Sequence, residues 1–393
     1  MLTSDMQAII CGFTAGAVAT IGPDGAPKVS IKATFVVLDD ATIAYGDLRS
    51  PGTRANLLAD PRVEVCFTDV LERKAVRVTG TATILKKDEA PEIDAVFAAG
   101  WGDFRNSMSA YVKIDVTAAE LILSPAYDRG ETAEALRWAN LAKLPGLHAP
   151  YPPAAYPTRT NELGQIVGAP LPEDWTPPPA PSREALEGRY CLVEPLDAAK
   201  HGADLFQALE RDETGEGWTY LFHSAFESEA AFSSFLAQIA EKDYPLQFAY
   251  IDKATGKAVG FGSYLRIAPL LGSIEVGGLR FSPLMQRTPV STEAMHLMMA
   301  HAFDLGYRRY EWKCDNLNLP SKRAAERLGF VYEGVFRKAV HNKGRNRDTA
   351  WFAIVDDDWP TVRAAHEAWL DPANFDLAGQ QKRSLRDIMT GDA

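Results

Sequence analysis

Apolar and polar residues alternate along several short segments in the first third of the chain. The alternation is clearest at residues 28–37, 62–68 and 76–84. A period of two places successive side chains on opposite faces of a strand, so each segment predicts a half-buried β-strand. The sequence GPDGAP, which follows Ile21, predicts a hairpin turn between two of them. Many short strands joined by tight turns predict a small all-β barrel.

One short helix interrupts these strands. Ser50 is a typical capping residue, and Pro51 follows it at the first helical position, where no N–H is needed. Pro61 prevents the helix from continuing.

The pattern changes after a proline-rich stretch between Pro145 and Pro181, which predicts an extended, semi-rigid connection. Beyond it, strands such as 246–252 alternate with helices whose apolar residues recur at steps of three and four, as at 289–303. This mixture predicts an α/β (α+β) domain. We therefore expect an all-β barrel at 1–142, a Pro-rich linker and lead-in segment at 143–182, the α/β domain at 183–375 and a C-terminal tail at 376–393.

Composition narrows the functional classes. The 393-residue chain carries a formal net charge of −11 at pH 7, which argues against nucleic-acid binding. Its four cysteines are far apart, so we expect neither a metal site nor a disulfide framework, and a reducing compartment fits best. The N-terminus lacks the pattern of a signal peptide, and no apolar run reaches membrane-spanning length. These features predict a cytoplasmic protein that does not associate with membranes.

The helix that begins at Pro289 raises a specific question. Thr288 is its expected N-cap, and the following turn exposes N–H groups that have no partner inside the helix. Such a helix start is also a binding site for an anion. The stretch is consistent with an ordinary capped helix and with a cradle for phosphate.

Three motifs in this half carry a resemblance to a known family. They are FSPLMQRTPVSTEAM from Phe281, YRRYEWKCDNLNLPSKRAAERLGF from Tyr307 and KGRNRDTAWFAIVDDDWP from Lys343. Together with the strand–helix–strand–helix order of the region, they resemble the GNAT N-acetyltransferases, in particular the branch of ribosomal-protein N-terminal acetyltransferases. The resemblance covers roughly residues 161–371. It implies a GNAT acyl-CoA N-acyltransferase fold, acetyl-CoA as cosubstrate, and a small-molecule amine or a protein N-terminus as acceptor.

The resemblance also implies where acetyl-CoA binds. The family loop Gln/Arg-x-x-Gly-x-Gly/Ala holds the pyrophosphate, but here Pro289 and Ser291 stand in place of the two glycines. Pro289 removes one N–H donor, whereas neighbouring N–H groups remain. The implied pyrophosphate residues are Gln286, Arg287, Thr288, Val290, Ser291 and Thr292, and the strand implied to pair with pantetheine is Leu279, Arg280 and Phe281.

Acetyl transfer requires a base that takes a proton from the amine and an acid that gives a proton to the departing thiolate. Glu275 is our candidate base, and its alternative is a solvated glutamate on a strand face. Many relatives use a tyrosine acid at the position of Ala325, so we expect Ser321 to substitute for it and Asn318 to position pantetheine. A helix cap is the alternative role for both residues.

Three further features of this half each allow more than one role. Trp218 and Tyr220, together with Phe222, either wall the acceptor site or pack in the core. Cys314 is expected to be a packing residue rather than an acylated nucleophile. The basic segment 337–347 either contacts acetyl-CoA, caps the acceptor pocket or is a solvated hairpin.

The first half carries a second resemblance. GAVATIGPDGAPKVSIKATFVVLDD, RKAVRVTG and SPAYDRG, within about residues 6–128, resemble the pyridoxamine-phosphate-oxidase-like split barrels. Many members bind FMN between two protomers, which implies FMN and a homodimer; the alternative is a dimerisation barrel without cofactor. Cations, hydroxyls and a helix start suit the flavin phosphate. The candidate residues are Ser30, Lys32, Asp47, Ser50, Thr53, Lys74 and Arg77.

The two resemblances together predict an acetyl-CoA-dependent N-acetyltransferase fused to an FMN-binding domain. Two other functions stay open. One is a flavin-dependent oxidoreductase, and the other is a sensor that binds a cofactor; in both, the acetyltransferase-like domain would be non-catalytic.

Overall fold

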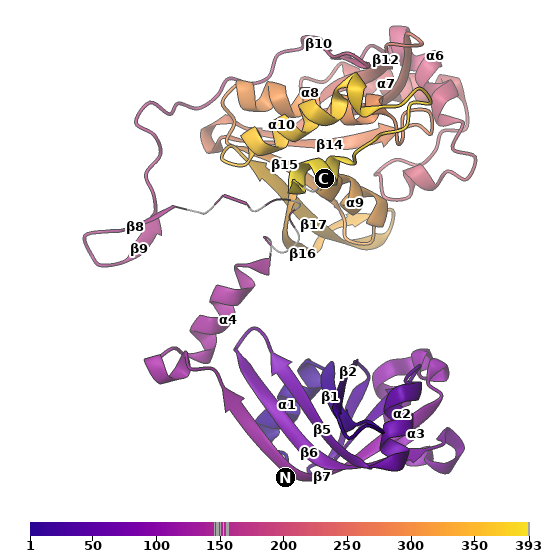
Figure 1. Ribbon diagram of the computed structural model, residues 1–393. Helices are drawn as coiled ribbons and strands as arrows, with labels where there is room; N and C mark the ends of the chain where they lie inside the picture. Colours follow the sequence, from indigo (N-terminus) through magenta and orange to yellow (C-terminus); the bar gives the residue numbers. More distant parts are fainter. Residues whose placement is uncertain (145, 147–148, 150, 152, 155–156, 392–393) are drawn as a thin grey trace. The chain divides into compact units, whose positions relative to one another are not determined.

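The computed structural model describes residues 1–144, 146, 149, 151, 153–154 and 157–391. The chain divides into two compact units, Met1–Lys143 and Leu144–Ala393 (Figure 1). The predicted order, an all-β unit followed by an α/β unit, is confirmed. No helix among the described residues is both long and apolar enough to cross a membrane.

The N-terminal unit is built on one seven-stranded antiparallel sheet with the order β2-β1-β5-β6-β7-β4-β3. The alternation of apolar and polar residues explains which side chains form the core of this unit. In β5, for example, Val63, Val65 and Phe67 point inward while their neighbours point outward. The order begins at β2 and ends at β3, so within the described residues the sheet is open rather than a closed barrel. The strands are β1 (Gly16–Ile21), β2 (Pro27–Lys32), β3 (Phe35–Asp39), β4 (Thr42–Asp47), β5 (Arg62–Asp69), β6 (Lys74–Leu85) and β7 (Ala110–Leu123).

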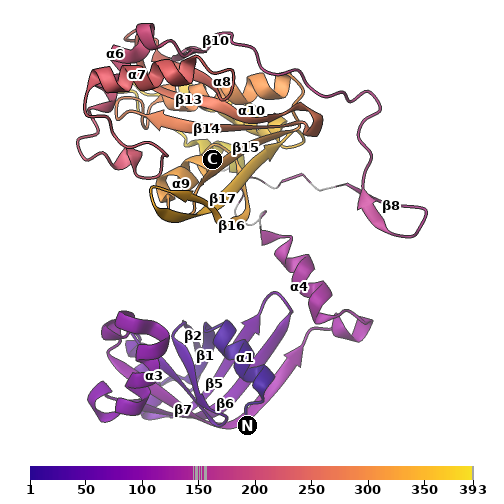
Figure 2. The same ribbon diagram turned by 180° about the vertical axis from the view of Figure 1, so that it is seen from behind.

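Four α-helices accompany this sheet in the described part of the unit (Figure 1; Figure 2 shows α1, α3 and α4 from behind). They are α1 (Ser4–Gly12), α2 (Pro51–Ala59), α3 (Pro91–Trp101) and α4 (Ala133–Leu141). Helix α2 is the predicted short helix, with Ser50 at its N-cap. Helix α1 buries Met6, Ile9 and Ile10 against the sheet core.

The C-terminal unit is built on an eight-stranded sheet with the order β10-β11-β12-β13-β14-β15-β17-β16. Strands β14 and β15 pair in parallel, whereas the other neighbours pair antiparallel. The strands are β10 (Leu186–Glu187), β11 (Cys191–Pro195), β12 (Leu246–Asp252), β13 (Lys257–Ala268), β14 (Ser273–Phe281), β15 (Arg309–Asp315), β16 (Val331–Asn342) and β17 (Arg345–Val355).

Helices pack against both faces of this sheet. On one face, α8 and α10 contribute Met295, Met298 and Val362 to the larger core (Figure 1). A second core forms where Leu205 of α6 and Leu236 of α7 meet the sheet. The helices are α6 (Ala198–Leu209), α7 (Glu229–Ala240), α8 (Pro289–Asp304), α9 (Leu319–Arg327), α10 (Trp359–Leu370) and α11 (Leu385–Thr390).

Both ends of the α/β domain extend further than the sequence indicated. Tyr151, within the expected linker, is 4% exposed, and its hydroxyl donates to the carbonyl of Gly329 at 2.9 Å. In the expected tail, helix α11 buries Leu385 and Met389 in the same core. The linker region also forms a hairpin, β8 (Thr158–Thr160) with β9 (Ile166–Gly168). Parts of the expected 143–182 segment, namely residues 145, 147–148, 150, 152 and 155–156, lie outside the described residues.

A buried carboxylate fixes the first turns of α8. Glu293 is 5% exposed, and its side chain accepts N–H groups from Arg189, Tyr190 and Cys191 at 2.8, 2.5 and 2.6 Å. Gly188 leaves the space that this requires, since a Cβ there would lie 2.4 Å from Glu293. Glu293 therefore joins α8 to the turn between β10 and β11.

We expect Glu293→Gln to destabilise the C-terminal unit by about 2 kcal/mol, because an amide nitrogen would replace one acceptor among buried N–H donors. Urea unfolding followed by tryptophan fluorescence measures the loss. Glu367→Gln, which removes an exposed carboxylate paired with Arg363, is the matched control and should change stability by less than about 0.5 kcal/mol. Equal effects of the two changes would contradict this role of Glu293.

Candidate functional site

The candidate site opens where β14 and β15 separate. They pair from Ser273 with Arg309 to Val276 with Trp312, and not beyond. A bulge in β14 follows, because Gly277 pairs with Ser263 whereas Arg280 pairs with Phe261. Gly278, inside the bulge, has a φ of +62°, a conformation that favours glycine. The edge of β14 after the bulge therefore borders a cavity of about 2000 Å³, where an extended ligand chain can pair with it.

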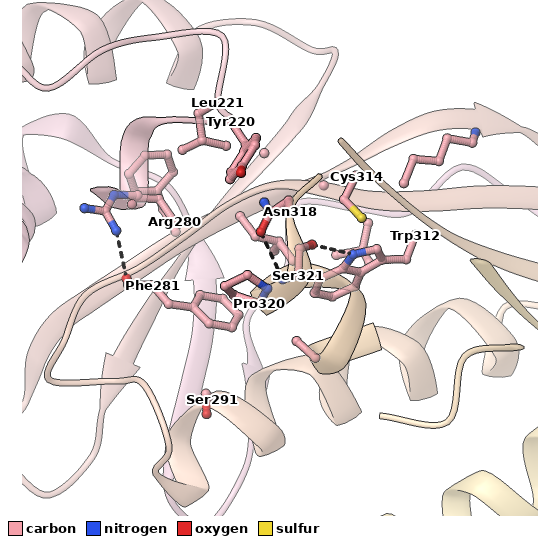
Figure 3. Close-up of a pocket in the computed structure, with 18 of the residues that line it drawn as sticks. Tyr220, Leu221, Arg280, Phe281, Ser291, Trp312, Cys314, Asn318, Pro320 and Ser321 are labelled. Carbon is pink, nitrogen blue, oxygen red and sulfur yellow. Dashed lines mark hydrogen bonds between the residues drawn. The ribbon is translucent and has the colours of Figure 1, made fainter. Parts of the chain in front are cut away.

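The first turn of α8 borders the same cavity. Thr288 occupies the N-cap position but makes no side-chain cap, because its hydroxyl donates to the carbonyl of Met285 at 2.7 Å. The hydroxyl of Ser291 likewise donates to the carbonyl of Thr288 at 2.9 Å. Because neither side chain caps the turn, the N–H groups of Val290 and Ser291 keep no side-chain acceptor, which suits an anion. Figure 3 shows Ser291 on this turn.

The other predicted residues of this loop lie around that turn. Arg287 has a φ of +60°, and Gln286 donates from its side chain to the carbonyl of Phe281 at 3.0 Å. Thr292 is buried and accepts a hydrogen bond from Arg327 of α9 at 3.0 Å. The loop is thus held by contacts to β14 and α9. Because these side chains are engaged, the backbone N–H groups of the turn are its main hydrogen-bond donors toward the cavity.

Arg280 lies on the free edge of β14, and its side chain contacts residues 212–218 rather than the first turn of α8. Its side chain is 2% exposed, pairs with Asp212 at 2.7 Å and lies 4.7 Å from the ring centre of Trp218. It also donates to the carbonyl of Phe281 at 3.0 Å (Figure 3). Arg280 therefore ties the segment 212–218 to the end of β14.

Glu275 lies on the floor of the cleft and is 5% exposed. Its carboxylate accepts from Lys313 Nζ at 2.7 Å and pairs with Arg266 at 2.9 Å. Lys313 also donates to Glu311 at 2.6 Å and lies 3.7 Å above the ring of Trp351. Burial raises the pKa of Glu275, and the neighbouring cations offset only part of this rise. A buried carboxylate with a raised pKa is suited to accept a proton.

Ser321 and Asn318 meet at the start of α9. The side chain of Asn318 caps the helix by accepting from Ser321 N at 3.1 Å. Trp312 Nε1 donates to Ser321 Oγ at 3.0 Å, so the hydroxyl proton of Ser321 is left to donate (Figure 3). Both residues line the cleft, and the cap uses Oδ1 of Asn318 but not its side-chain NH2. A cap and a cleft-facing group therefore coexist here.

Cys314 lies beside Ser321 at the end of β15 (Figure 3). Its side chain is buried, and burial raises the pKa of the thiol. A thiol with a raised pKa carries little thiolate, so the environment of Cys314 is that of a packing residue. Ala325, the position of the family's tyrosine, is fully buried in α9.

The basic hairpin between β16 and β17 holds the segment that covers the cleft. Asn342 donates to the carbonyls of Tyr220 and Leu221 at 3.4 and 3.2 Å, and Lys343 donates to that of Trp218 at 2.7 Å. Tyr220 reaches the carbonyl of Leu317 at 3.2 Å across the cleft. Trp218 is buried between Arg280 and Phe226, in the core, although it also borders the cavity. These contacts join the basic segment to residues 218–221.

The sequence pattern did not single out Thr349 and Trp351 on the cleft side of β17, and it included Arg347 only as the end of the basic segment 337–347. Arg347, Thr349 and Trp351 all line the cavity, and Trp351 pairs in register with Lys313. The alternate spacing of these residues in NRDTAWF is the signal that could have found them, since a period of two places them on one face.

In the N-terminal unit, five predicted residues gather near the start of α2. The hydroxyls of Ser30 and Thr53 lie 3.0 Å apart. Ser50 makes no side-chain cap, so it is free to contact a ligand. Burial lowers the pKa of Lys32, and the nearby Asp47 opposes this effect. Asp47 is itself buried, and one carboxylate oxygen has no hydrogen-bond partner. Two hydroxyls, a cation and a helix start suit a phosphate, and the orphaned oxygen suits an N–H or O–H donor of the same ligand.

Lys74 and Arg77 do not join this group within the chain. Strands β1 and β5 separate their strand, β6, from β2. Lys74 pairs with Glu72 at 2.8 Å, and Arg77 pairs with Glu120 on the outer face of the sheet. Their charges are already balanced by carboxylates.

Comparisons with known proteins match both units. A family model described as Pyridoxamine 5'-phosphate oxidase matches residues 2–121, and one described as Acetyltransferase (GNAT) domain matches residues 191–331. A curated relative, "Uncharacterized N-acetyltransferase YnaD" of Bacillus subtilis (strain 168), is 27% identical over 86 residues. That match covers 22% of this chain and 50% of the relative, so the chain spans about half the length of that protein.

Two crystal structures resemble the C-terminal unit. A GCN5-related N-acetyltransferase from Brucella melitensis is 49% identical with a TM-score of 0.54, over 55% of this chain and 99% of that one. A probable acetyltransferase of the GNAT family from Chromobacterium violaceum ATCC 12472 is 38% identical with a TM-score of 0.47, over 49% and 97% of the two chains. Since the match at 49% identity spans nearly the whole of the Brucella protein, the chain belongs to the GCN5-related N-acetyltransferase family, with a pyridoxamine-phosphate-oxidase-like domain before the acetyltransferase domain.

Proposed function

We propose that the C-terminal unit transfers an acetyl group from acetyl-CoA to an amine, either a small molecule or a protein N-terminus. One observation carries this proposal: the free edge of β14, the uncapped first turn of α8 and the buried Glu275 border one cavity. The α8 turn would hold the pyrophosphate, and the edge from Leu279 to Phe281 would pair with pantetheine. Glu275 would face the amine.

The chemistry needs one bond to form and one to break. The amine nitrogen attacks the thioester carbon, and Glu275 takes the proton that the nitrogen loses. A backbone N–H at the β14 bulge stabilises the oxygen of the tetrahedral intermediate. The C–S bond then breaks, and Ser321 donates its hydroxyl proton to the departing sulfur and recovers a proton from solvent. Trp312 holds Ser321 for this step through its hydrogen bond to Oγ.

Calorimetric titration of acetyl-CoA into the purified protein tests the proposal, together with release of the CoA thiol in the presence of an amine panel. Saturable binding with amine-dependent thiol release is expected. Binding without turnover would instead favour a sensor, in which acetyl-CoA controls assembly. Failure to bind acetyl-CoA would reject the proposal.

We expect Ser321→Ala to lower kcat roughly 10²-fold, because the thiolate would leave without a positioned proton donor. The affinity for acetyl-CoA should stay unchanged, since the Asn318 cap uses the backbone N–H of residue 321 rather than its side chain. Steady-state thiol release gives kcat, and calorimetry gives Kd. An unchanged kcat would leave Ser321 with a capping role alone.

For the N-terminal unit we propose FMN binding. The convergence of Ser30, Lys32, Ser50 and Thr53 at the start of α2 supports it, with Asp47 positioned to accept a hydrogen bond from the same ligand. Bound FMN would supply hydride and electron transfer, which is the chemistry of the alternative function, a flavin-dependent oxidoreductase. Turnover of a reduced nicotinamide cofactor by the yellow protein would favour that alternative.

We expect Lys32→Met to lose FMN, because it removes a partly buried cation that shares a face of β2 with Ser30. Lys74→Met is the matched control: Lys74 pairs with Glu72 and lies on β6, which β1 and β5 separate from β2, so its loss should leave flavin bound. Flavin absorbance of the two purified proteins, with circular dichroism to confirm folding, measures the difference. Flavin loss from Lys74→Met alone would reverse the assignment.

We also propose that the N-terminal unit forms a homodimer. Val29 and Ile31 on the edge strand β2 are 67% and 65% exposed, an apolar pair that association would cover. Light scattering of the intact chain measures the mass. A monomer at micromolar concentration would exclude this dimer. A cytoplasmic setting is part of the proposal and agrees with the four free thiols.

A further inference from the structure

Side chains of β17 form a row of unsatisfied donors in the acceptor part of the cleft. Arg347, Thr349 and Trp351 alternate along the strand and line the cavity. Arg347 Nε, Thr349 Oγ1 and Trp351 Nε1 are all buried and have no hydrogen-bond partner among the described residues. Buried polar groups are normally paired, so three consecutive unpaired groups on one strand face require an explanation.

The row lies on the same sheet face as the candidate base. Glu275 pairs in register with Glu311 on β15, two residues before Lys313. Lys313 in turn pairs with Trp351, and Thr349 and Arg347 follow at alternate positions. Residues at alternate positions share a face, so the row runs outward along β17 from the region of Glu275. One ligand in the cleft can therefore reach both.

The hydrogen-bond donors and the charge of these three side chains indicate the kind of ligand that suits them. Each of the three side chains can donate a hydrogen bond, and Arg347 adds a positive charge. No ion pair of Arg347 occurs among the described residues, and its guanidinium lies 5.6 Å from the ring centre of Phe222. The carboxylate opposite Thr349 in register, Asp315, accepts instead from the N–H of Leu317 at 2.9 Å. A charged donor and two neutral donors without acceptors complement an oxyanion.

We propose that Arg347, Thr349 and Trp351 bind a carboxylate carried by the amine substrate. This inference rests on the proposed acetyl transfer and names the class of acceptor: an amine whose carboxylate lies at the far end of an extended chain. Glu275 would meet the amine, and the β17 row would meet the carboxylate. Asn342 and Lys343 would keep the covering segment in place, so the ligand lies between it and β17.

Matched pairs of amines test the proposal. The first pair is 6-aminohexanoate and n-pentylamine, and the second is triglycine and triglycinamide; the members of each pair differ in the carboxylate. We expect kcat/KM to favour the carboxylate roughly 10- to 100-fold, the range of a charge-assisted hydrogen bond. 5-Aminopentyl phosphate is a further arm, and a greater preference for it would identify phosphate rather than carboxylate as the natural group.

Variants of the β17 residues test whether these residues cause the preference for a carboxylated amine. Arg347→Met keeps the length of the side chain and should reduce the preference to about twofold or less. Thr349→Val should reduce the preference by a smaller factor. Arg337→Met, an exposed arginine on β16 that does not line the cavity, is the matched control and should keep the full preference.

Binding measurements separate this inference from the proposed function. Calorimetry of 6-aminohexanoate with the CoA-bound protein needs no turnover. If acetyl-CoA binds but neither carboxylated amine binds saturably, the β17 assignment is wrong while acetyl transfer stands. Equal kcat/KM within each pair, or an unchanged preference in Arg347→Met, would overturn it as well.

Discussion

Replacing Glu275 by glutamine is expected to lower kcat roughly 10³-fold, within the range for loss of a general base. The amide keeps the size of the side chain and can still accept hydrogen bonds from Lys313 and Arg266, but it cannot take a proton from the amine. The fold and the site for acetyl-CoA should therefore be preserved. Thiol release at saturating amine gives kcat, and calorimetry gives the affinity for acetyl-CoA.

Glu311→Gln is the control for this change. Glu311 is also a carboxylate bonded to Lys313 on the same sheet face, but it is paired with Arg309 as well and does not line the cavity. Its replacement should alter kcat by less than about tenfold. Similar losses in both variants would show that the ion-pair network matters and that Glu275 is not the base.

The pH dependence follows from the same residue. Only the ionised form of Glu275 accepts a proton, so the rate should fall as the pH decreases through its pKa. Burial raises that pKa, and the acid limb should therefore lie above the range of an ordinary glutamate. Lys313→Met removes a cation that opposes the rise, and the limb should move to still higher pH. The pH profile of kcat/KM reports both shifts.

Ser291→Asp should abolish measurable binding of acetyl-CoA without lowering the melting temperature. A carboxylate roughly 4 Å from the pyrophosphate would add about 4 kcal/mol of repulsion at an effective dielectric constant near 20. This corresponds to on the order of a thousandfold in affinity. The helix itself should tolerate the change, because a negative charge in the first turn interacts favourably with the helix dipole.

A second helix start offers a matched control. Ser228 caps α7 and does not line the cavity, and aspartate is an equally good cap. Ser228→Asp adds the same charge to the protein at another helix N-terminus, so it separates local repulsion from a change in net charge. Calorimetric titration of acetyl-CoA into both variants and the parent decides the matter. Wild-type affinity in Ser291→Asp would mean that this turn is only a helix start.

Local sequence patterns predicted the individual helices and strands of this chain better than they predicted the contacts between them. Period-two alternation located β5 and β6, and Thr288-Pro289 located the start of α8, because each of these signals depends on a few adjacent residues. Glu275 could likewise be placed on a strand face. Its pairing with Lys313 and Arg266 could not, because it depends on the register between three strands.

The packing of residues outside the expected 183–375 segment could not be predicted for a related reason. Proline-rich composition predicts an extended chain, but nothing local shows that the ring of Tyr151 enters a core built from residues far ahead in the sequence. The same holds for Leu385 and Met389 in α11. The partner of Lys74, Glu72, could not be read from strand periodicity either, because the pairing depends on the turn between β5 and β6.

The three bonds that Glu293 accepts have a thermodynamic consequence for ligand binding. Glu293 lies two residues after Ser291, so its three hydrogen bonds hold the turn that would receive the phosphates in place before any ligand binds. Ordering a flexible backbone takes roughly 1–2 kcal/mol per residue, and a turn fixed in advance spares that loss when the anion binds. Loosening this anchor should therefore make acetyl-CoA association less favourable in entropy, although Glu293 itself makes no contact with the cosubstrate in the proposed complex.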